Sequence, residues 1–190
     1  MTRLVALAGS ARRDSLNKTL ARWAGRFAES LGAQVTVVDL ANFEIPLYNG
    51  DLEQNSGIPE NASQLRGILQ GADGLIIASP EYNGSLTPLL KNVIDWTSRP
   101  EGDTPGLAAW RGKTAAILAA SPGGLGGLRG LAHLRDILSG IGVFVLPTQC
   151  AVSQAHKAFD VGGDLTDERI RGLLEAAIRE LVATTGALKA

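Results

Sequence analysis

Three runs of small and polar residues in this chain have the residue types and positions of ligand-binding loops. They span residues 9–17, 79–85 and 121–129, and each follows a short apolar segment and precedes a segment with helical periodicity. The carboxyl ends of parallel strands lie at one edge of a sheet, so the three runs would meet there. Three such loops can enclose a flat, phosphorylated ligand.

The run 9–17 offers groups that suit a phosphate. A phosphate carries negative charge and acceptor oxygens, whereas a helix N-terminus presents free N–H groups and a positive dipole. Ser10, Ser15 and Asn17 add short donors, and Arg12 adds a fixed positive charge. A simple helix cap at Ser15 or Asn17 explains the run equally well. The run is neither a P-loop nor a Gly-x-Gly-x-x-Gly dinucleotide loop.

The run 79–85 suits the edge of a planar ring. Pro80 is rigid and Gly84 is conformationally permissive, so the backbone can approach a ligand closely. Tyr82 provides an aromatic surface with a polar tip. We therefore interpret this run as the border of a flavin ring. The alternative is an ordinary strand-to-helix turn with a surface tyrosine.

The run 121–129 is rich in glycine. Backbone N–H groups at Gly123 and Gly124 can line the pyrimidine edge of a flavin, because no side chain covers them. Arg129 would meet a cofactor phosphate or an acidic residue of a partner subunit. A flexible glycine-rich turn remains the alternative.

Apolar runs alternate with helical periodicity along the whole chain, which predicts a parallel sheet covered by helices on both faces. We expect one domain over residues 1–190, with a doubly wound, five-stranded sheet of order 2-1-3-4-5. Gly32 would end the first helix, and Thr166 would cap the last. The expected strands are 4–8, 35–40, 74–78, 114–119 and 143–146; the expected helices are 16–31, 59–70, 86–96, 128–140 and 167–183; residues 41–60 and 98–112 are expected to be long loops.

Composition excludes several classes of function. The formal net charge of −1 gives no sign of a nucleic-acid or membrane surface, and the apolar start of the chain is too short for a signal sequence. A cytoplasmic protein is therefore expected. His133 and His156 lack metal-ligand spacing and would lie at the surface, so no metal site is expected. The single cysteine, Cys150, would be a buried structural thiol.

Taken in order, the motifs resemble those of a known family. The motifs are Gly9-Ser10-x-Arg12-x-x-Ser15-x-Asn17, then Ser79 to Ser85 followed by Leu90-Lys91-Asn92-x-Ile94-Asp95-Trp96, and finally Ser121-Pro122-Gly123-Gly124-x-Gly126-Gly127-x-Arg129. Together they are similar to the motifs of the NADPH-dependent FMN reductase family. That group is flavodoxin-like and includes quinone, azo-dye and chromate reductases.

The resemblance implies a tightly held, noncovalent flavin mononucleotide (FMN) and a homodimer or homotetramer. Residues 86–96 and 41–60 would then form the subunit interface. The cofactor-binding residues implied are Ser10, Arg12, Ser15, Leu16 and Asn17 around the phosphate, Pro80, Glu81, Tyr82, Asn83 and Gly84 at the ring, and Ser121, Gly123 and Gly124 on the opposite side.

These expectations give an oxidoreductase in which NAD(P)H and an electron acceptor use one site in turn. The acceptor would be a quinone, a free flavin, an azo compound or a metal oxyanion. The flavin carries the chemistry, so no catalytic side chain is required, although Tyr82 is a possible proton donor. A flavodoxin-type electron carrier without turnover of its own is the rival hypothesis, and a non-redox ligand-binding domain is a third. Such carriers are usually strongly acidic, which this chain is not.

Overall fold

A computed structural model describes residues 1–189. Its centre is a parallel sheet of order β2-β1-β3-β4-β5, as the sequence predicts, and a further strand, β6, also pairs with β4. Every residue of β3 and β4 is buried, because helices cover both faces of the sheet. The strands are β1 (Arg3–Ala8), β2 (Gln34–Val38), β3 (Gly74–Ala78), β4 (Thr114–Ala120), β5 (Phe144–Val145) and β6 (Cys150–Val152).

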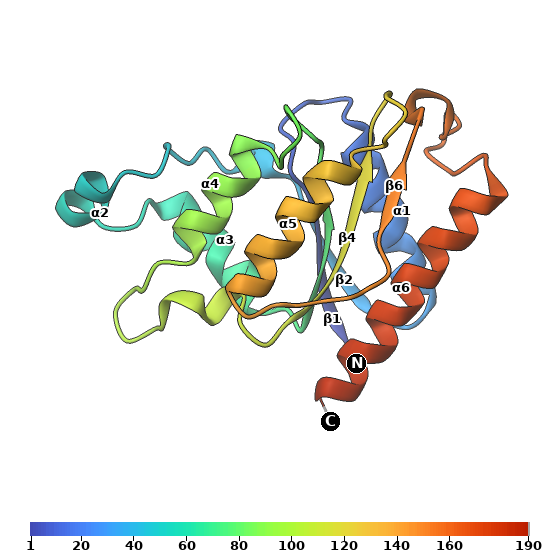
Figure 1. Cartoon of the computed structure of the whole chain (residues 1–190). Helices are drawn as coiled ribbons and strands as arrows, with labels where there is room; N and C mark the ends of the chain where they lie inside the picture. The colour runs from blue at the N-terminus through green and yellow to red at the C-terminus, as the bar shows by residue number, and fades with distance from the viewer. Residues whose placement is uncertain (190) are drawn as a thin grey trace.

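The helices form two layers around the sheet (Figure 1). The helices α1 (Leu16–Ser30) and α6 (Glu168–Lys189) lie on one side, and α3 (Glu60–Gln70), α4 (Pro88–Thr97) and α5 (Leu128–Gly140) lie on the other. The remaining short helices are α2 (Gly50–Ser56), η1 (Leu40–Asn42), η2 (Gly106–Ala109) and η3 (Ala155–Lys157).

The alternation of side chains along each strand divides the core in two. In β1, Leu4, Ala6 and Ala8 pack towards α1 and α6, whereas Val5 and Leu7 pack towards α3, α4 and α5. This period of two is what a strand with two covered faces requires. Burial on both faces fixes the strand register, and it therefore fixes where the loops after β1, β3 and β4 emerge.

The prediction of a single fifth strand over 143–146 is wrong in its extent. The ladder beside β4 consists of Phe144–Val145, then a break, then Cys150–Val152. Pro147 lies in the break, and proline has no N–H to donate to a ladder. Pairing resumes once the chain has passed it.

Two other local predictions are wrong. The N-cap of α6 is Asp167, not Thr166: its Oδ1 accepts from the N–H groups of Arg169 and Ile170, at 2.8 and 3.1 Å. The segment 41–60 is not all loop, because Asn49 caps the short helix α2 in it. That helix extends away from the body of the molecule (Figure 1) and buries no residue, so hydrophobic periodicity gave no sign of it.

No helix within residues 1–189 is both long and apolar enough to cross a membrane.

Candidate flavin site

A cavity of about 390 Å³ opens at the carboxyl edge of the sheet. The loops around it gather at the end of the sheet that lies away from both chain termini (Figure 1). The volume is within the range of sites for small molecules and cofactors. The residues that line it are Ser10, Arg12, Asp14, Ser15, Leu16, Asn17, Pro80, Glu81, Tyr82, Ala120, Ser121, Pro122 and His156.

The first loop presents an open helix N-terminus to this cavity. Ser15 occupies the N-cap position of α1, yet within the described chain its side chain makes no capping hydrogen bond, and the first turn holds no acidic residue. The hydroxyl of Ser10 accepts from the N–H of Arg12 at 3.2 Å, which leaves its own proton free. Both serines are nearly buried, whereas Arg12 is exposed. The arrangement suits an anion.

Asn17 joins the first loop to the third. Its Nδ2 donates to the carbonyl oxygen of Ala120 at 2.8 Å, and its Oδ1 accepts from the N–H of Ala120 at 2.9 Å. The side chain is buried and lines the cavity. Its main contact is therefore with the backbone at the end of β4, and one Nδ2 hydrogen remains for a ligand.

The second loop is a tight hairpin, and the residues before its tip line the cavity. Tyr82 and Ser85 exchange backbone hydrogen bonds of 2.9 and 3.1 Å, and Asn83 and Gly84 both have positive φ. Two such residues make a type I′ turn, for which Asn-Gly is the favoured pair. Asn83 and Gly84 form the tip and do not line the cavity, whereas Pro80 and the half-exposed Tyr82 do.

Glu81 points from the second loop to the start of α5. Its Oε1 accepts from Nε of Arg129 at 2.7 Å, and its Oε2 accepts from the N–H groups of Arg129 and Gly130 at 3.1 and 3.3 Å. Burial raises the pKa of Glu81, but these hydrogen bonds outweigh it, and the pKa lies below its usual value. The expectation that Arg129 meets a phosphate or a partner subunit is thus replaced by an ion pair within the chain.

The third loop is held by the segment after β6. Ser121 receives a hydrogen bond from the N–H of Ala155, and Gly123 receives one from that of Gln154, at 3.0 and 3.3 Å. Of the predicted residues on this loop, Ser121 lines the cavity, whereas Gly123 and Gly124 do not. Both glycines are exposed on the rim, where a bound molecule could contact them.

His156, which was expected only at the surface, also lines this cavity. It lies on η3, which the backbone hydrogen bonds to the third loop bring to the cavity. Because β6 and η3 were not predicted, no pattern linked residue 156 to this edge of the sheet. Asp14, Ala120 and Pro122 also line the cavity, and each adjoins or lies within a predicted loop.

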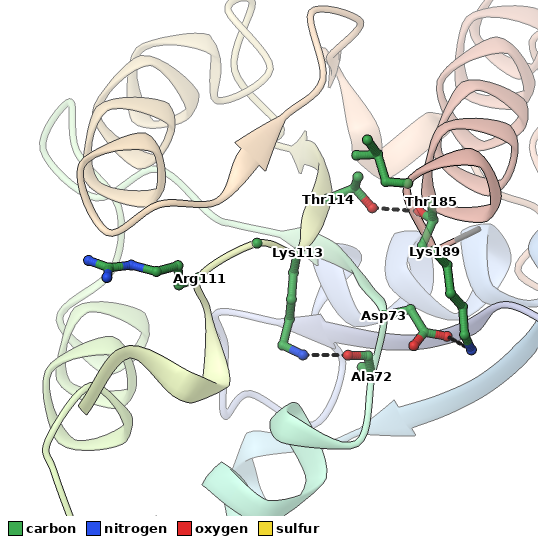
Figure 2. A pocket seen from close by; sticks show the side chains of 9 residues that line it. Ala72, Asp73, Arg111, Lys113, Thr114, Thr185 and Lys189 are labelled. Atoms are coloured by element: carbon green, nitrogen blue, oxygen red, sulfur yellow. Dashed lines mark hydrogen bonds and ion pairs between the residues drawn. The ribbon is translucent and has the colours of Figure 1, made fainter. Parts of the chain in front are cut away.

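A second cavity, of about 220 Å³, lies at the opposite edge of the sheet (Figure 2). Three of its four charged side chains are engaged with one another or with backbone: Nζ of Lys189 donates to Asp73 at 2.8 Å, and Lys113 donates to the carbonyl oxygen of Ala72. Arg111 points away from both groups in Figure 2. The cavity is smaller than the roughly 300 Å³ at which small-molecule sites begin. Residues 1–189 contain no cluster of side chains suited to a metal ion.

Comparison with known proteins supports the flavin interpretation. Residues 2–157 match the family model of the NADPH-dependent FMN reductases. The chain is 35% identical to a probable NADPH:quinone oxidoreductase of Oryza sativa over 95% of this chain and 87% of that protein. It is 36% identical to an NAD(P)H-dependent FMN reductase of Pseudomonas aeruginosa, over 94% of this chain and 92% of that protein.

The fold agrees with that match. The structure superposes on the flavoenzyme NAD(P)H:(acceptor) oxidoreductase of Paracoccus denitrificans with a TM-score of 0.84 and 28% identity, and 98% of each chain is covered. The sheet order, the three loops and the extent of these matches lead to one assignment. The chain belongs to the NADPH-dependent FMN reductase family and is an FMN-dependent oxidoreductase.

Proposed function

We propose that this protein reduces quinones with NAD(P)H at an FMN held between the loops after β1, β3 and β4. The open N-terminus of α1 carries this proposal, because it faces the same cavity as the aromatic wall at Tyr82. A site that joins an anion-binding helix end to an aromatic surface fits a ring that bears a phosphate.

The residues present fit FMN at both ends. We assign the phosphate to the hydroxyls of Ser10 and Ser15, the guanidinium of Arg12 and the free N–H groups of Leu16 and Asn17. The buried serines provide fixed donors, and Arg12 supplies a charge that stays positive at any working pH. Asp14 also lines the cavity, and its carboxylate opposes part of that positive charge.

The ring would lie between the second and third loops. Pro80 and Tyr82 border one side, and Ser121, Gly123 and Gly124 border the other, with Asn83 and Gly84 at the outer tip. Exposed glycine N–H groups on the rim favour negative charge beside them. Bound FMN would supply hydride acceptance and the passage of two electrons to the acceptor.

The protein's own part in turnover is to position the flavin and the substrates. Tyr82 lines the cavity and is 48% exposed, so part of its ring surface is accessible to solvent and to a second planar molecule. NAD(P)H and the quinone would occupy that accessible surface in turn, which predicts ping-pong kinetics. The hydroxyl of Tyr82 can hold a proton there, and so can water.

The test of this function is a set of initial rates at varied NADPH and quinone concentrations. Parallel double-reciprocal lines are expected, and intersecting lines would contradict a shared site. Purified protein should also carry a flavin absorption band that NADPH bleaches. Bleaching without turnover on any of a panel of quinones, flavins and azo compounds would indicate the electron carrier instead.

Four arginines of the loop segments, Arg12, Arg13, Arg99 and Arg129, are candidates for contact with the 2′-phosphate of NADPH. Arg99 is paired with Glu53 at 2.8 Å and lies over the ring of Tyr48, and Arg129 is paired with Glu81. Arg12 and Arg13 are exposed, and neither forms an ion pair within residues 1–189. We therefore propose Arg13 as the 2′-phosphate contact. Arg13→Gln should raise the KM for NADPH and leave that for NADH unchanged.

We also propose a homodimer or homotetramer in the cytoplasm, built from one domain. The segment 43–49 packs on α4: Nε1 of Trp96 donates to the carbonyl oxygen of Pro46 at 2.8 Å, and the N–H of Tyr48 donates to Asn92 at 2.7 Å. Leu47 is 78% exposed beside an open groove along α4 and α5 that includes Ile137 and Ile141. These apolar groups support an interface there, and sedimentation of the FMN-loaded protein tests it.

A further inference from the structure

Glu81 lies on the wall of the flavin cavity, yet its carboxylate faces away from the cavity. The side chain is 9% exposed, and its two oxygens are fully occupied by the side chain of Arg129 and by two backbone N–H groups at the first turn of α5. The dipole of a helix stabilises a carboxylate at its N-terminus, and hydrogen bonds to a charged group are stronger than those between neutral groups.

The start of α5 is shaped to receive this carboxylate. A Cβ on Gly127 would lie 2.7 Å from the Cβ of Ala119, and a Cβ on Gly130 would lie 3.1 Å from the carbonyl oxygen of Ser85. The helix therefore packs directly against β4 and against the hairpin that carries Tyr82. A side chain at Gly127 would push α5 away from β4, and a side chain at Gly130 would push it a few tenths of an ångström away from the second loop, which is a physical reason for glycine there.

We propose that Glu81 is a positioning residue that sets the width of the slot for the flavin ring. By fastening the hairpin to α5, it fixes Pro80 and Tyr82 relative to the third loop, which runs directly into α5 at Gly127. The inference rests on the proposed flavin site. Glu81 and Arg129 neutralise one another, so the effect of this contact on FMN is geometric and not a matter of net charge.

Binding of the flavin ring and binding of the phosphate can be measured separately. A change in slot width should weaken the binding of FMN and of riboflavin by the same factor, because both carry the ring. A change at the phosphate loop should weaken FMN alone. The ratio of the two dissociation constants therefore reports which part of the site a substitution disturbs.

The variants follow from the individual contacts. Arg129→Met removes the ion pair and leaves both backbone hydrogen bonds, so its effect should be smallest. Glu81→Gln retains one acceptor oxygen and loses the charge, and Glu81→Ala frees the hairpin completely. We expect the affinity loss to increase in that order and to reach about tenfold in Glu81→Ala, because only part of the lost contact energy is transmitted to the flavin slot.

The experiment is a titration of each apoprotein with FMN and with riboflavin, in which quenching of the flavin fluorescence reports binding. Thermal unfolding of each apoprotein is measured as well. At an ionic strength high enough to screen the single charge that each substitution leaves, equal factors for both flavins in Arg129→Met and Glu81→Gln are expected, and Ser15→Ala, as the control, should affect FMN alone. A lower melting temperature with unchanged dissociation constants would make Glu81 merely structural and overturn the inference. Wild-type apoprotein that binds neither flavin would instead overturn the proposed site.

Discussion

Asn17 shows how one side chain can take the place of a strand partner. Both ends of its amide bind the backbone of Ala120, where β4 ends and no neighbouring strand can pair with it from that side. Asn17 is itself 3% exposed, so both bonds are almost completely shielded from water. The residue that resembles a phosphate ligand in the sequence is thus also the contact that holds α1 to β4.

Asn17→Ala should therefore destabilise the protein even without cofactor. It leaves a buried N–H and a buried carbonyl group unpaired, and each costs about 1–3 kcal/mol. We expect a loss of about 2–4 kcal/mol in the free energy of unfolding of the apoprotein in urea. The matched control is Asn61→Ala, because Nδ2 of Asn61 donates to the backbone carbonyl oxygen of Glu44 on the exposed surface. Equal losses in the two variants would contradict the argument.

Cys150 should be chemically inert in the folded protein. The thiol is buried in β6, and burial raises its pKa to about 11. At pH 8 roughly one molecule in a thousand would carry the reactive thiolate. A thiol reagent added at pH 8 should label the protein only after denaturant is added, and rapid labelling of the native protein would contradict this assignment.

At the scale of elements, the interior was predictable from the sequence and the periphery was not. The strand of 74–78 and the helix of 128–140 have the predicted bounds, because buried apolar spacing defines both. The helix α2 buries nothing, and the ladder beside β4 resumes only after Pro147, so apolar spacing could reveal neither. Because β6 and η3 were not predicted, His156 could not be assigned to the site from the sequence.

The bend into α5 has a geometry that depends on residue type. Gly126 has φ of +63°, and a Cβ there would lie 2.8 Å from backbone atoms of Ala151, Val152 and Ser153. Gly126→Ala should therefore cost about 2–4 kcal/mol, from a strained backbone and from separation of the loop from β6. A Cβ on Gly124 would meet nothing within 4 Å, so Gly124→Ala is the matched control in the same unfolding measurement. A small loss at Gly126 would mean that the loop can move away from β6 at little cost.

At the scale of the whole molecule, the two edges of the sheet have different tasks. The carboxyl edge leaves donors open: the first turn of α1 is uncapped within the described chain, and Arg12 has no ion-pair partner there. At the opposite edge, Asp73 accepts from the N–H of Arg3 at 2.8 Å and from Nζ of Lys189 at 2.8 Å, so it ties the first strand to the last helix. The opposite edge therefore has this carboxylate paired, whereas the carboxyl edge keeps donors free for a ligand.

Asp73 should make that edge sensitive to acid. Burial raises its pKa, but hydrogen bonds from Lys189 and Arg3 outweigh burial and bring the pKa from 3.8 to about 2. Because the folded pKa is the lower one, the stabilisation is fully present above pH 3.8 and is lost as the pH falls towards 2. The shift corresponds to about 2 kcal/mol.

The comparison of wild type with Asp73→Asn isolates this contribution. The difference in their free energies of unfolding should be constant from pH 7 to pH 5 and should shrink by about 2 kcal/mol as the pH approaches 2. Asp164→Asn is the control, because the pair of Asp164 with Arg26 is largely exposed and should contribute little at any pH. A pH-independent difference for Asp73→Asn would mean that the Asp73 carboxylate gains no more from Lys189 and Arg3 than it gains from water. The closure of the sheet edge by Asp73 would then be a matter of packing alone.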